Sequence, residues 1–151
     1  MNDHATADRP GTLVLHAATA ADVMMPNPVS LRADATVAEA IALLTDRGFN
    51  AAPVIDEAGH PIGVLSHTDL LAHERERSPG TGGSGEPDPT RVYDLMTPAV
   101  FSVSPDTSAA QVVDEMLAHR VHRLFVVDST GVLVGVVAAL DVLRRLRPSE
   151  L

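Results

Sequence analysis

The spacing of apolar residues predicts an amphipathic helix at residues 36–47. Its apolar positions recur at intervals of three and four residues, which places them on one helical face. They are Val37, Ala40, Ile41 and Leu44. Thr36 and Glu39 have the spacing of a capping box, and Gly48 suits the C-terminal stop. The helix is therefore expected to begin at Thr36 and to end just before Gly48.

Shorter apolar runs predict strands on either side of this helix. They are bounded by Gly, Pro, Asn or Asp, residues that favour turns. In chain order, the elements expected in this part of the chain are a helical turn at 22–25, a strand at 29–31, the helix at 36–47, strands at 52–55 and 61–65, and a helix near 66–77.

The same order of elements returns 72 residues farther along the chain. Residues 22–71 align with residues 94–143 without a gap, and 13 of the 50 aligned positions are identical. A gapless match of this length indicates a duplicated structural unit. The matching elements are a helical turn at 92–96, a helix capped by Ser108 and Gln111, strands at 101–103, 124–127 and 133–137, and a final helix near 138–147.

A Gly/Pro-rich segment separates the repeats and predicts a linker, because it contains four Gly and three Pro in 13 residues. A unit of about 55 residues is marginally stable alone, so the two repeats are expected to share a core. The expected organisation is a disordered tail at 1–18 (within which Thr12 to Leu15 could add a short strand), a first repeat at 19–77, the linker at 78–90, a second repeat at 91–147 and a tail at 148–151.

Composition excludes several classes of protein. The 151 residues include no Cys, which removes disulfides, thiol nucleophiles and Cys-ligated metals. Eleven basic residues, all Arg, face 20 acidic ones, and a net charge of -9 disfavours nucleic acid as a general partner. No apolar run approaches the roughly 20 residues that span a bilayer. The first ten residues do not resemble a secretory signal, so a cytoplasmic location without membrane association is expected.

The repeated motifs resemble the CBS domain. Both repeats have a D-x-M-x-P start and an apolar strand followed by Asp and then Gly, and the first contains the segment Gly63-Val64-Leu65-Ser66-His67-Thr68-Asp69. The resemblance spans about residues 20–147. It implies an α+β fold of two β-α-β-β-α repeats packed through their sheets with pseudo-twofold symmetry. It also implies a non-catalytic regulatory module that binds AMP, ADP, ATP or S-adenosylmethionine in a cleft between the repeats, without a resident cofactor, and that forms homodimers.

Three polar residues of that segment are candidates for ligand binding. Ser66 can donate its hydroxyl to a phosphate, and the two oxygens of Asp69 suit a pair of ribose hydroxyls. Thr68 adds a hydroxyl beside them. The resemblance assigns the ribose to this Asp. The alternative is structural, since Ser-x-x-Asp is also an ordinary helix cap followed by an acidic residue in the first turn.

The second repeat departs from this pattern. Ala138 stands where the first repeat has Ser66, and Leu140 stands where it has Thr68. Asp141 is kept, which leaves at most a weaker second cleft. The sequence therefore predicts asymmetric binding, with one competent cleft per chain.

His122 and Arg123 are the candidate phosphate ligands. They immediately precede the predicted strand at 124–127 and resemble a His-Arg pair that contacts AMP phosphates in regulatory γ subunits of AMP-activated protein kinase. Arg offers a planar fork for phosphate, and His adds a hydrogen bond or charge. The alternative is that both flank a strand and pair with acidic residues. The first repeat has the uncharged Asn50 and Ala51 there.

The adenine base would need an apolar slot. Candidates in the first repeat are Val29, Ala52, Pro53 and Val64, and each is also a reasonable core residue. Phe125 replaces the Pro found in the first repeat and either narrows this pocket or fills core.

Other functions have less support in the sequence. The seven His are scattered and no metal-ligand motif is present, so no metal site is expected. No base stands beside a nucleophile, so no catalytic residue is assigned. The remaining alternative is a ligand-independent module that dimerises or docks on an unidentified protein. The homodimer is expected from the resemblance and also from apolar helix residues such as Leu70, Leu71 and Leu143.

Overall fold

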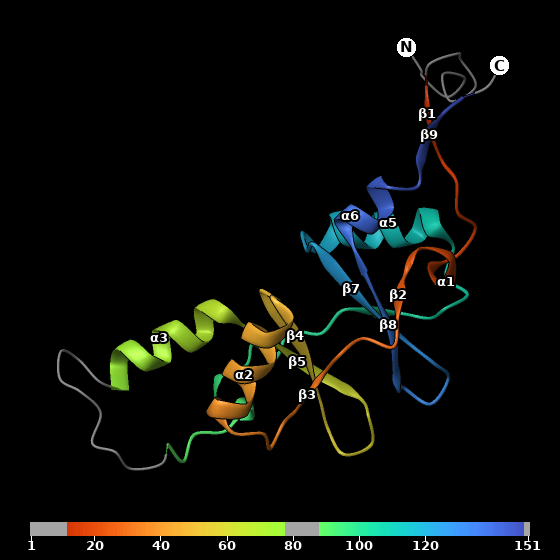
Figure 1. The fold of residues 1–151 in the computed structure, drawn as a ribbon. Helices are drawn as coiled ribbons and strands as arrows, with labels where there is room; N and C mark the ends of the chain where they lie inside the picture. Colours follow the sequence, from red (N-terminus) through yellow and green to blue (C-terminus); the bar gives the residue numbers. More distant parts are fainter. Residues whose placement is uncertain (1–11, 78–87, 150–151) are drawn as a thin grey trace. The chain divides into compact units, whose positions relative to one another are not determined.

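The computed structural model describes residues 12–77 and 88–149. These residues form two compact units (Figure 1). Unit 1 contains the described residues up to Asn27 together with 101–130 and those from Val134 onward. Unit 2 contains residues 28–100 and 131–133. The predicted packing of the repeats through their sheets, with pseudo-twofold symmetry, stays a prediction.

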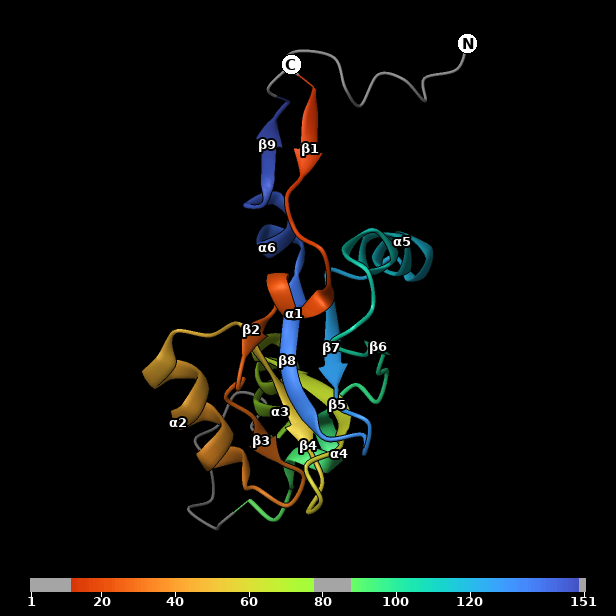
Figure 2. The ribbon, with the colours of Figure 1, turned by 90° about the vertical axis from the view of Figure 1, so that its right-hand side faces the viewer.

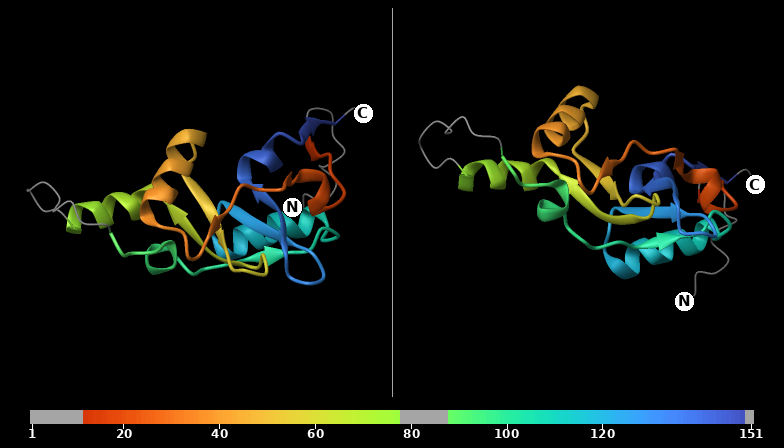
Figure 3. Two further views of the ribbon diagram at one scale, coloured as in Figure 1. Left: turned by 60° about the horizontal axis from the view of Figure 1, so that its bottom comes forward. Right: turned by 90° about the horizontal axis from the view of Figure 1, so that it is seen from below.

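Unit 2 is built on a three-stranded sheet covered by helices. The strand order is β3-β4-β5, with β3 parallel to β4 and β4 antiparallel to β5. Both views in Figure 3 show α3 continuing from the end of β5. The elements are β3 (Leu31–Arg32), α2 (Val37–Arg47), β4 (Ala51–Ile55), β5 (Pro61–Ser66), α3 (His67–Arg77) and α4 (Val92–Leu95).

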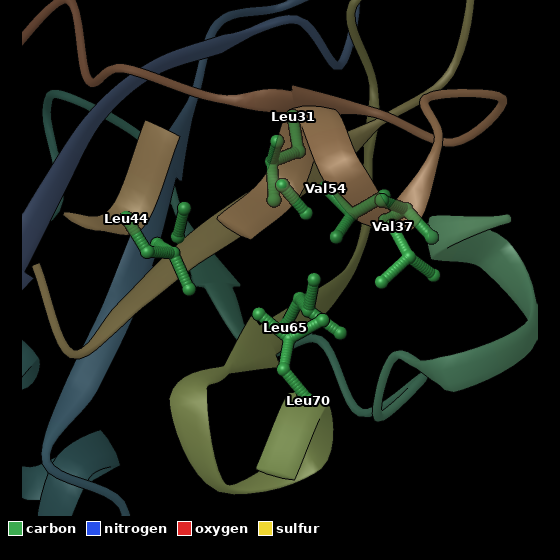
Figure 4. Packing of buried hydrophobic residues seen from close by; sticks show 9 residues of the cluster. Leu31, Val37, Leu44, Val54, Leu65 and Leu70 are labelled. Atoms are coloured by element: carbon green, nitrogen blue, oxygen red, sulfur yellow. The ribbon is translucent and has the colours of Figure 1, made fainter. Parts of the chain in front are cut away.

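The helix predicted at 36–47 is confirmed together with its caps. The Glu39 backbone N–H donates to Thr36 Oγ1 over 3.0 Å, and the Thr36 backbone N–H donates to Glu39 Oε1 over 2.8 Å. Gly48 follows in the left-handed region with φ +67°. The apolar face of this helix lies in the core of unit 2. Figure 4 shows this core, to which every strand of the sheet and helices α2 and α3 contribute. The labelled residues are Leu31, Val37, Leu44, Val54, Leu65 and Leu70. The expectation that Leu70 offers apolar surface for a dimer was wrong, because it is only 6% exposed and packs in this core.

Unit 1 repeats this plan with a wider sheet. The strand order is β2-β8-β7-β6, and Figure 2 shows β8 between β2 and β7. A separate antiparallel pair joins β1 to β9, near the ends of the described chain (Figure 1). The elements are β1 (Leu13–Leu15), α1 (Ala20–Val23), β2 (Met25–Pro26), β6 (Ser102–Val103), α5 (Ala109–His119), β7 (Arg123–Val127), β8 (Leu133–Ala138), α6 (Ala139–Leu143) and β9 (Leu146–Pro148).

The units do not follow the repeat boundaries drawn from the sequence. The leading turn of the first repeat belongs to unit 1, where Ala20 and Val23 are buried against α5 and β2 pairs with β8. The leading turn of the second repeat belongs to unit 2. There Val92 of α4 is fully buried, and Thr97 forms a β-bridge with Val64. Each unit thus combines the sheet of one repeat with the leading turn of the other.

The ends of the chain differ from the sequence-based expectation at two places. Leu13–Leu15, inside the predicted disordered tail, form β1, in line with the short strand considered there. The last helix ends at Leu143 instead of about Arg147, because residues 146–148 pair with β1. The strand expected at 29–31 also lies slightly later, at Leu31–Arg32.

Parts of the predicted tails and most of the predicted linker lie outside the described residues, namely 1–11, 78–87 and 150–151. Within the described ranges, no helix is both long enough and apolar enough to cross a membrane.

Candidate ligand-binding residues

The turn from β5 to α3 is held by reciprocal hydrogen bonds between Ser66 and Asp69. Asp69 Oδ2 accepts from the Ser66 backbone N–H and from the Ser66 hydroxyl, both over 2.9 Å. The Asp69 backbone N–H in turn donates to Ser66 Oγ over 3.2 Å. These bonds satisfy backbone donors that the first helical turn leaves unpaired. The capping role weighed from the sequence is therefore realised in the structure.

The same turn keeps polar atoms accessible. Thr68 is exposed and its hydroxyl lies 2.9 Å from Ser66 Oγ, while Ser66 and Asp69 are half-buried. Among the described residues, Asp69 Oδ1 has no hydrogen-bond partner. One carboxylate oxygen therefore caps the helix, and the other can accept hydrogen bonds from a ligand without disturbing the cap.

The matching turn of unit 1 has no carboxylate oxygen that is open in this way. The Ala138 backbone N–H donates to Asp141 Oδ2 over 2.8 Å, which preserves half of the cap. Arg144 lies 3.7 Å from Asp141 Oδ1 and is more than half exposed. The oxygen that stays open in Asp69 thus already faces a cation in Asp141, and no hydroxyl stands at positions 138 to 140.

His122 and Arg123 lie at the start of β7 in unit 1, and both are exposed. Within the part of the chain that the structure describes, neither side chain has a hydrogen-bond or ion-pair partner, which does not fit the alternative that they pair with acidic residues. The His122 carbonyl accepts the Ala139 backbone N–H over 2.9 Å, and the Asn50 carbonyl accepts that of His67 over 2.8 Å in unit 2. This backbone bond ties the start of the strand to the start of the helix in both repeats.

The four candidates for the base slot all lie in unit 2 and differ in exposure. Ala52 is only 2% exposed and belongs to the hydrophobic core, which agrees with its interpretation as a core residue. Val29, Pro53 and Val64 are half-buried and keep some accessible surface. Phe125 is buried in unit 1. The ribose and base candidates therefore belong to one unit, and the phosphate candidates to the other.

One charged cluster has no counterpart among the sequence predictions. His73 Nε2 of α3 lies 2.8 Å from Asp88 Oδ2, and Arg77 Nε lies 3.4 Å from the same oxygen. The hydrogen bond with His73, followed by the one from the Thr90 backbone, holds the pKa of Asp88 well below its usual value. Asp88 belongs to the predicted linker, where composition gave no reason to expect a specific contact.

This cluster also contains the metal-ligand types His and carboxylate. Ligand atoms of His73, Glu74 and Asp88 lie within 4.8 Å of one another. Arg77, however, lies within 4.0 Å of both carboxylates, at 3.9 Å from Glu74 and 3.4 Å from Asp88. A guanidinium so close to both carboxylates supplies the positive charge that a metal ion would bring, so an ion-pair network explains the cluster.

Comparisons with known proteins show what the chain is similar to. The human 5'-AMP-activated protein kinase subunit gamma-3 is 30% identical over 112 residues, which cover 74% of this chain and 23% of that subunit. The chain spans about a quarter of the length of the curated relatives it matches first.

Solved structures match over more of their own length. The structure of CBSX2 in complex with AMP is 30% identical, with a TM-score of 0.67, over 85% of this chain and 95% of that one. The cytosolic domain of the Mg²⁺ channel MgtE in complex with ATP is 32% identical, with a TM-score of 0.68, over 86% and 49%. The CBS domain model matches residues 20–76 and again residues 92–148. With both of its repeats matched in this way, the chain belongs to the CBS domain family.

Proposed function

We propose that this chain is a regulatory module that binds an adenine nucleotide or a related adenosyl ligand. The observation that carries the proposal is the similarity to CBSX2 in complex with AMP, because it extends over nearly the whole of both chains at 30% identity. The MgtE domain with ATP supports the same ligand class. The proposed role is regulatory, not catalytic.

In this proposal, Asp69 binds the ribose hydroxyls through Oδ1, while Oδ2 continues to cap α3. Thr68 and Ser66 add hydroxyls beside the carboxylate. The side chains of His122 and Arg123, which are exposed and have no partner among the described residues, bind phosphate, for which a guanidinium is well suited. Val29, Pro53 and Val64 offer apolar surface for the base, and Ala52 supports them from the core.

The difference between Asp69 and Asp141 supports one competent site per chain. An oxygen that already faces Arg144 must give up that ion pair before it accepts a ribose hydroxyl. The lost hydroxyls at Ala138 and Leu140 remove two further polar contacts. Asp141 is therefore proposed to serve mainly as a helix cap, and any site built on it is weaker.

Calorimetric titration of AMP, ADP, ATP and S-adenosylmethionine tests the proposal. Asp69→Asn removes the charge but keeps an acceptor for the Ser66 backbone, and the matched control is Asp141→Asn. We expect about a ten-fold or greater loss of affinity for Asp69→Asn and little change for the control. Equal losses in both variants would contradict the asymmetry, and no heat from any ligand at millimolar concentration would reject nucleotide binding.

A double-mutant cycle tests whether residues of both units bind the same ligand molecule. Asp69→Asn and Arg123→Ala are measured singly and together. Residues that contact one ligand commonly show coupling energies of about 0.5–3 kcal/mol, whereas independent sites give additive losses. Strict additivity would assign the two residues to separate sites.

A second candidate is a ligand-independent interaction module, favoured by apolar side chains on the surface of unit 1. Leu117 is 72% exposed, Leu140 55% and Leu143 59%. Such side chains mark interaction surfaces when they gather in a patch. Sedimentation over a concentration series, with and without nucleotide, separates this candidate from the first. The homodimer, the protein partner and the cytoplasmic location expected from the sequence stay predictions.

A further inference from the structure

The C-terminal end of α5 contains an unusual arginine. Arg120 caps this helix with φ +57°, in the left-handed region that residues with a Cβ avoid. The first repeat has Gly48 at the matching position, with φ +67°. A glycine would therefore adopt this conformation at lower energy. The arginine in unit 1 raises the conformational energy of the backbone at this position.

Arg120 is also an exposed cation in an acidic protein. Its side chain is exposed and has no ion-pair or hydrogen-bond partner in the described parts of the chain. The sequence contains 20 acidic residues against 11 basic ones. A positive charge at a helix C-terminus is favourable in itself, and this accounts for part of its presence. That electrostatic effect does not explain why the arginine stands at the position with a left-handed backbone, since an arginine in the last turn of the helix would have the same benefit.

Arg120 and His122 line the same pocket of unit 1. The pocket has a volume of about 440 Å³ and lies against α5, α6 and the segment that precedes β7. These two are its only lining residues with ionisable side chains, and the other seven are apolar. Apolar walls strengthen the field of nearby charges because they keep high-dielectric water away. An anionic group that reaches this pocket therefore meets the Arg120 guanidinium and the hydrogen-bonding imidazole of His122 in a setting that favours its attraction to the arginine.

Unit 2 has no equivalent pair. The positions that match Arg120 and His122 hold Gly48 and Asn50, and both lack charge. The position that matches Leu117 of the pocket holds the polar Thr45. Among the described residues, the pocket with Arg120 and His122 thus belongs to the second repeat, the same repeat that contains Arg123.

We propose that Arg120 is a specificity-determining residue that binds the terminal phosphates of a nucleoside polyphosphate. This inference rests on the proposed function, in which His122 and Arg123 already bind phosphate. AMP has one phosphate, which those two residues satisfy. ADP and ATP extend the chain of phosphates and add negative charge, and Arg120 supplies the additional guanidinium beside His122. The chain therefore prefers ATP or ADP over AMP.

The test compares Arg120→Gly with the wild-type chain by calorimetric titration of AMP and of ATP. Glycine matches the residue at position 48 and accepts the left-handed backbone, so the variant is expected to fold with an unfolding temperature at or above that of the wild type. Loss of one charge-assisted contact corresponds to about a ten-fold weaker affinity for ATP. The affinity for AMP is expected to change by less than about two-fold, because in the proposed function its single phosphate binds His122 and Arg123.

The control is Arg47→Ala, which removes an exposed arginine from the last turn of α2 in unit 2 and changes the net charge equally. It is expected to leave both affinities unchanged. Equal losses for AMP and ATP in Arg120→Gly, or no loss for ATP, would overturn the inference and leave the proposed function intact. If the wild-type chain binds neither nucleotide, the proposed function and this inference fail together.

Discussion

The close approach of a backbone segment to Gly63 leads to a specific prediction for Gly63→Ala. A Cβ at this position would lie 2.6 Å from the Thr97 carbonyl oxygen and 2.7 Å from Met96 Sδ. The same carbonyl accepts the Val64 backbone N–H over 2.9 Å, and the Thr97 backbone N–H donates back over 2.8 Å. The new methyl group therefore pushes directly on the bridge that attaches residues 96–97 to β5.

The expected loss of stability follows from these contacts. Losing the two backbone hydrogen bonds costs about 1–3 kcal/mol, and crowding the Met96 side chain costs about 1–3 kcal/mol. Alanine restricts the unfolded chain more than glycine does, which returns about 0.4–1 kcal/mol. The net destabilisation is then about 1–5.5 kcal/mol with a midpoint near 3 kcal/mol, and the midpoint corresponds to an unfolding temperature lower by about 6–12 °C in a chain of this size.

Urea unfolding followed by circular dichroism measures this loss, and two further variants identify its cause. Gly48→Ala meets no atom within 4 Å but has φ +67°, so it should lose only about 1 kcal/mol. Met96→Ala in the Gly63→Ala background should relieve the sulfur contact and leave the clash with the Thr97 carbonyl. The reasoning is refuted if Gly63→Ala is no less stable than Gly48→Ala, or if Met96→Ala restores full stability.

Three smaller predictions concern caps and the ion-pair network. Ser66→Ala should lower the unfolding free energy by about 1 kcal/mol, and Ala138→Ser should raise it by about 0.5–1 kcal/mol, both measured in urea; an unchanged value in either variant would contradict the capping account. The hydrogen bond with His73 lowers the pKa of Asp88 in the folded protein. The Asp88 carboxylate therefore contributes fully to the unfolding free energy above its unfolded-state pKa, and this contribution decreases as the pH falls below that value. The difference in unfolding free energy between the wild type and Asp88→Asn should therefore be larger at pH 5 than at pH 3, and an equal difference at both would count against the network.

Local patterns predicted the elements well wherever a local interaction determines them. The helix at 36–47 begins and ends as expected because Thr36, Glu39 and Gly48 act within one turn of its ends. The strands 51–55 and 61–66 extend the predicted runs by one residue each. The structure at the end of the chain was harder to predict from the sequence, because Leu146–Pro148 pair with a segment more than 130 residues earlier. No local pattern contains that information.

The candidate site was predictable to a similar degree. Ser66 and Asp69 interact as their spacing suggested, although the geometry alone fits a helix cap as well as a ligand site. Asp88 was missed because Gly and Pro around it indicated only a linker. The left-handed Arg120 did leave a signal, because it aligns with Gly48, a residue chosen for the stop of the first helix. Comparison of the repeats at that one position would have identified it.

The exchange of leading turns means that neither half of the chain encodes a complete hydrophobic core. Val92 completes the core of the first repeat, and Ala20 and Val23 complete that of the second. A protease that cuts between Arg77 and Asp88 would thus yield two fragments that need each other to fold, as in a split protein that regains its structure when the pieces reassociate.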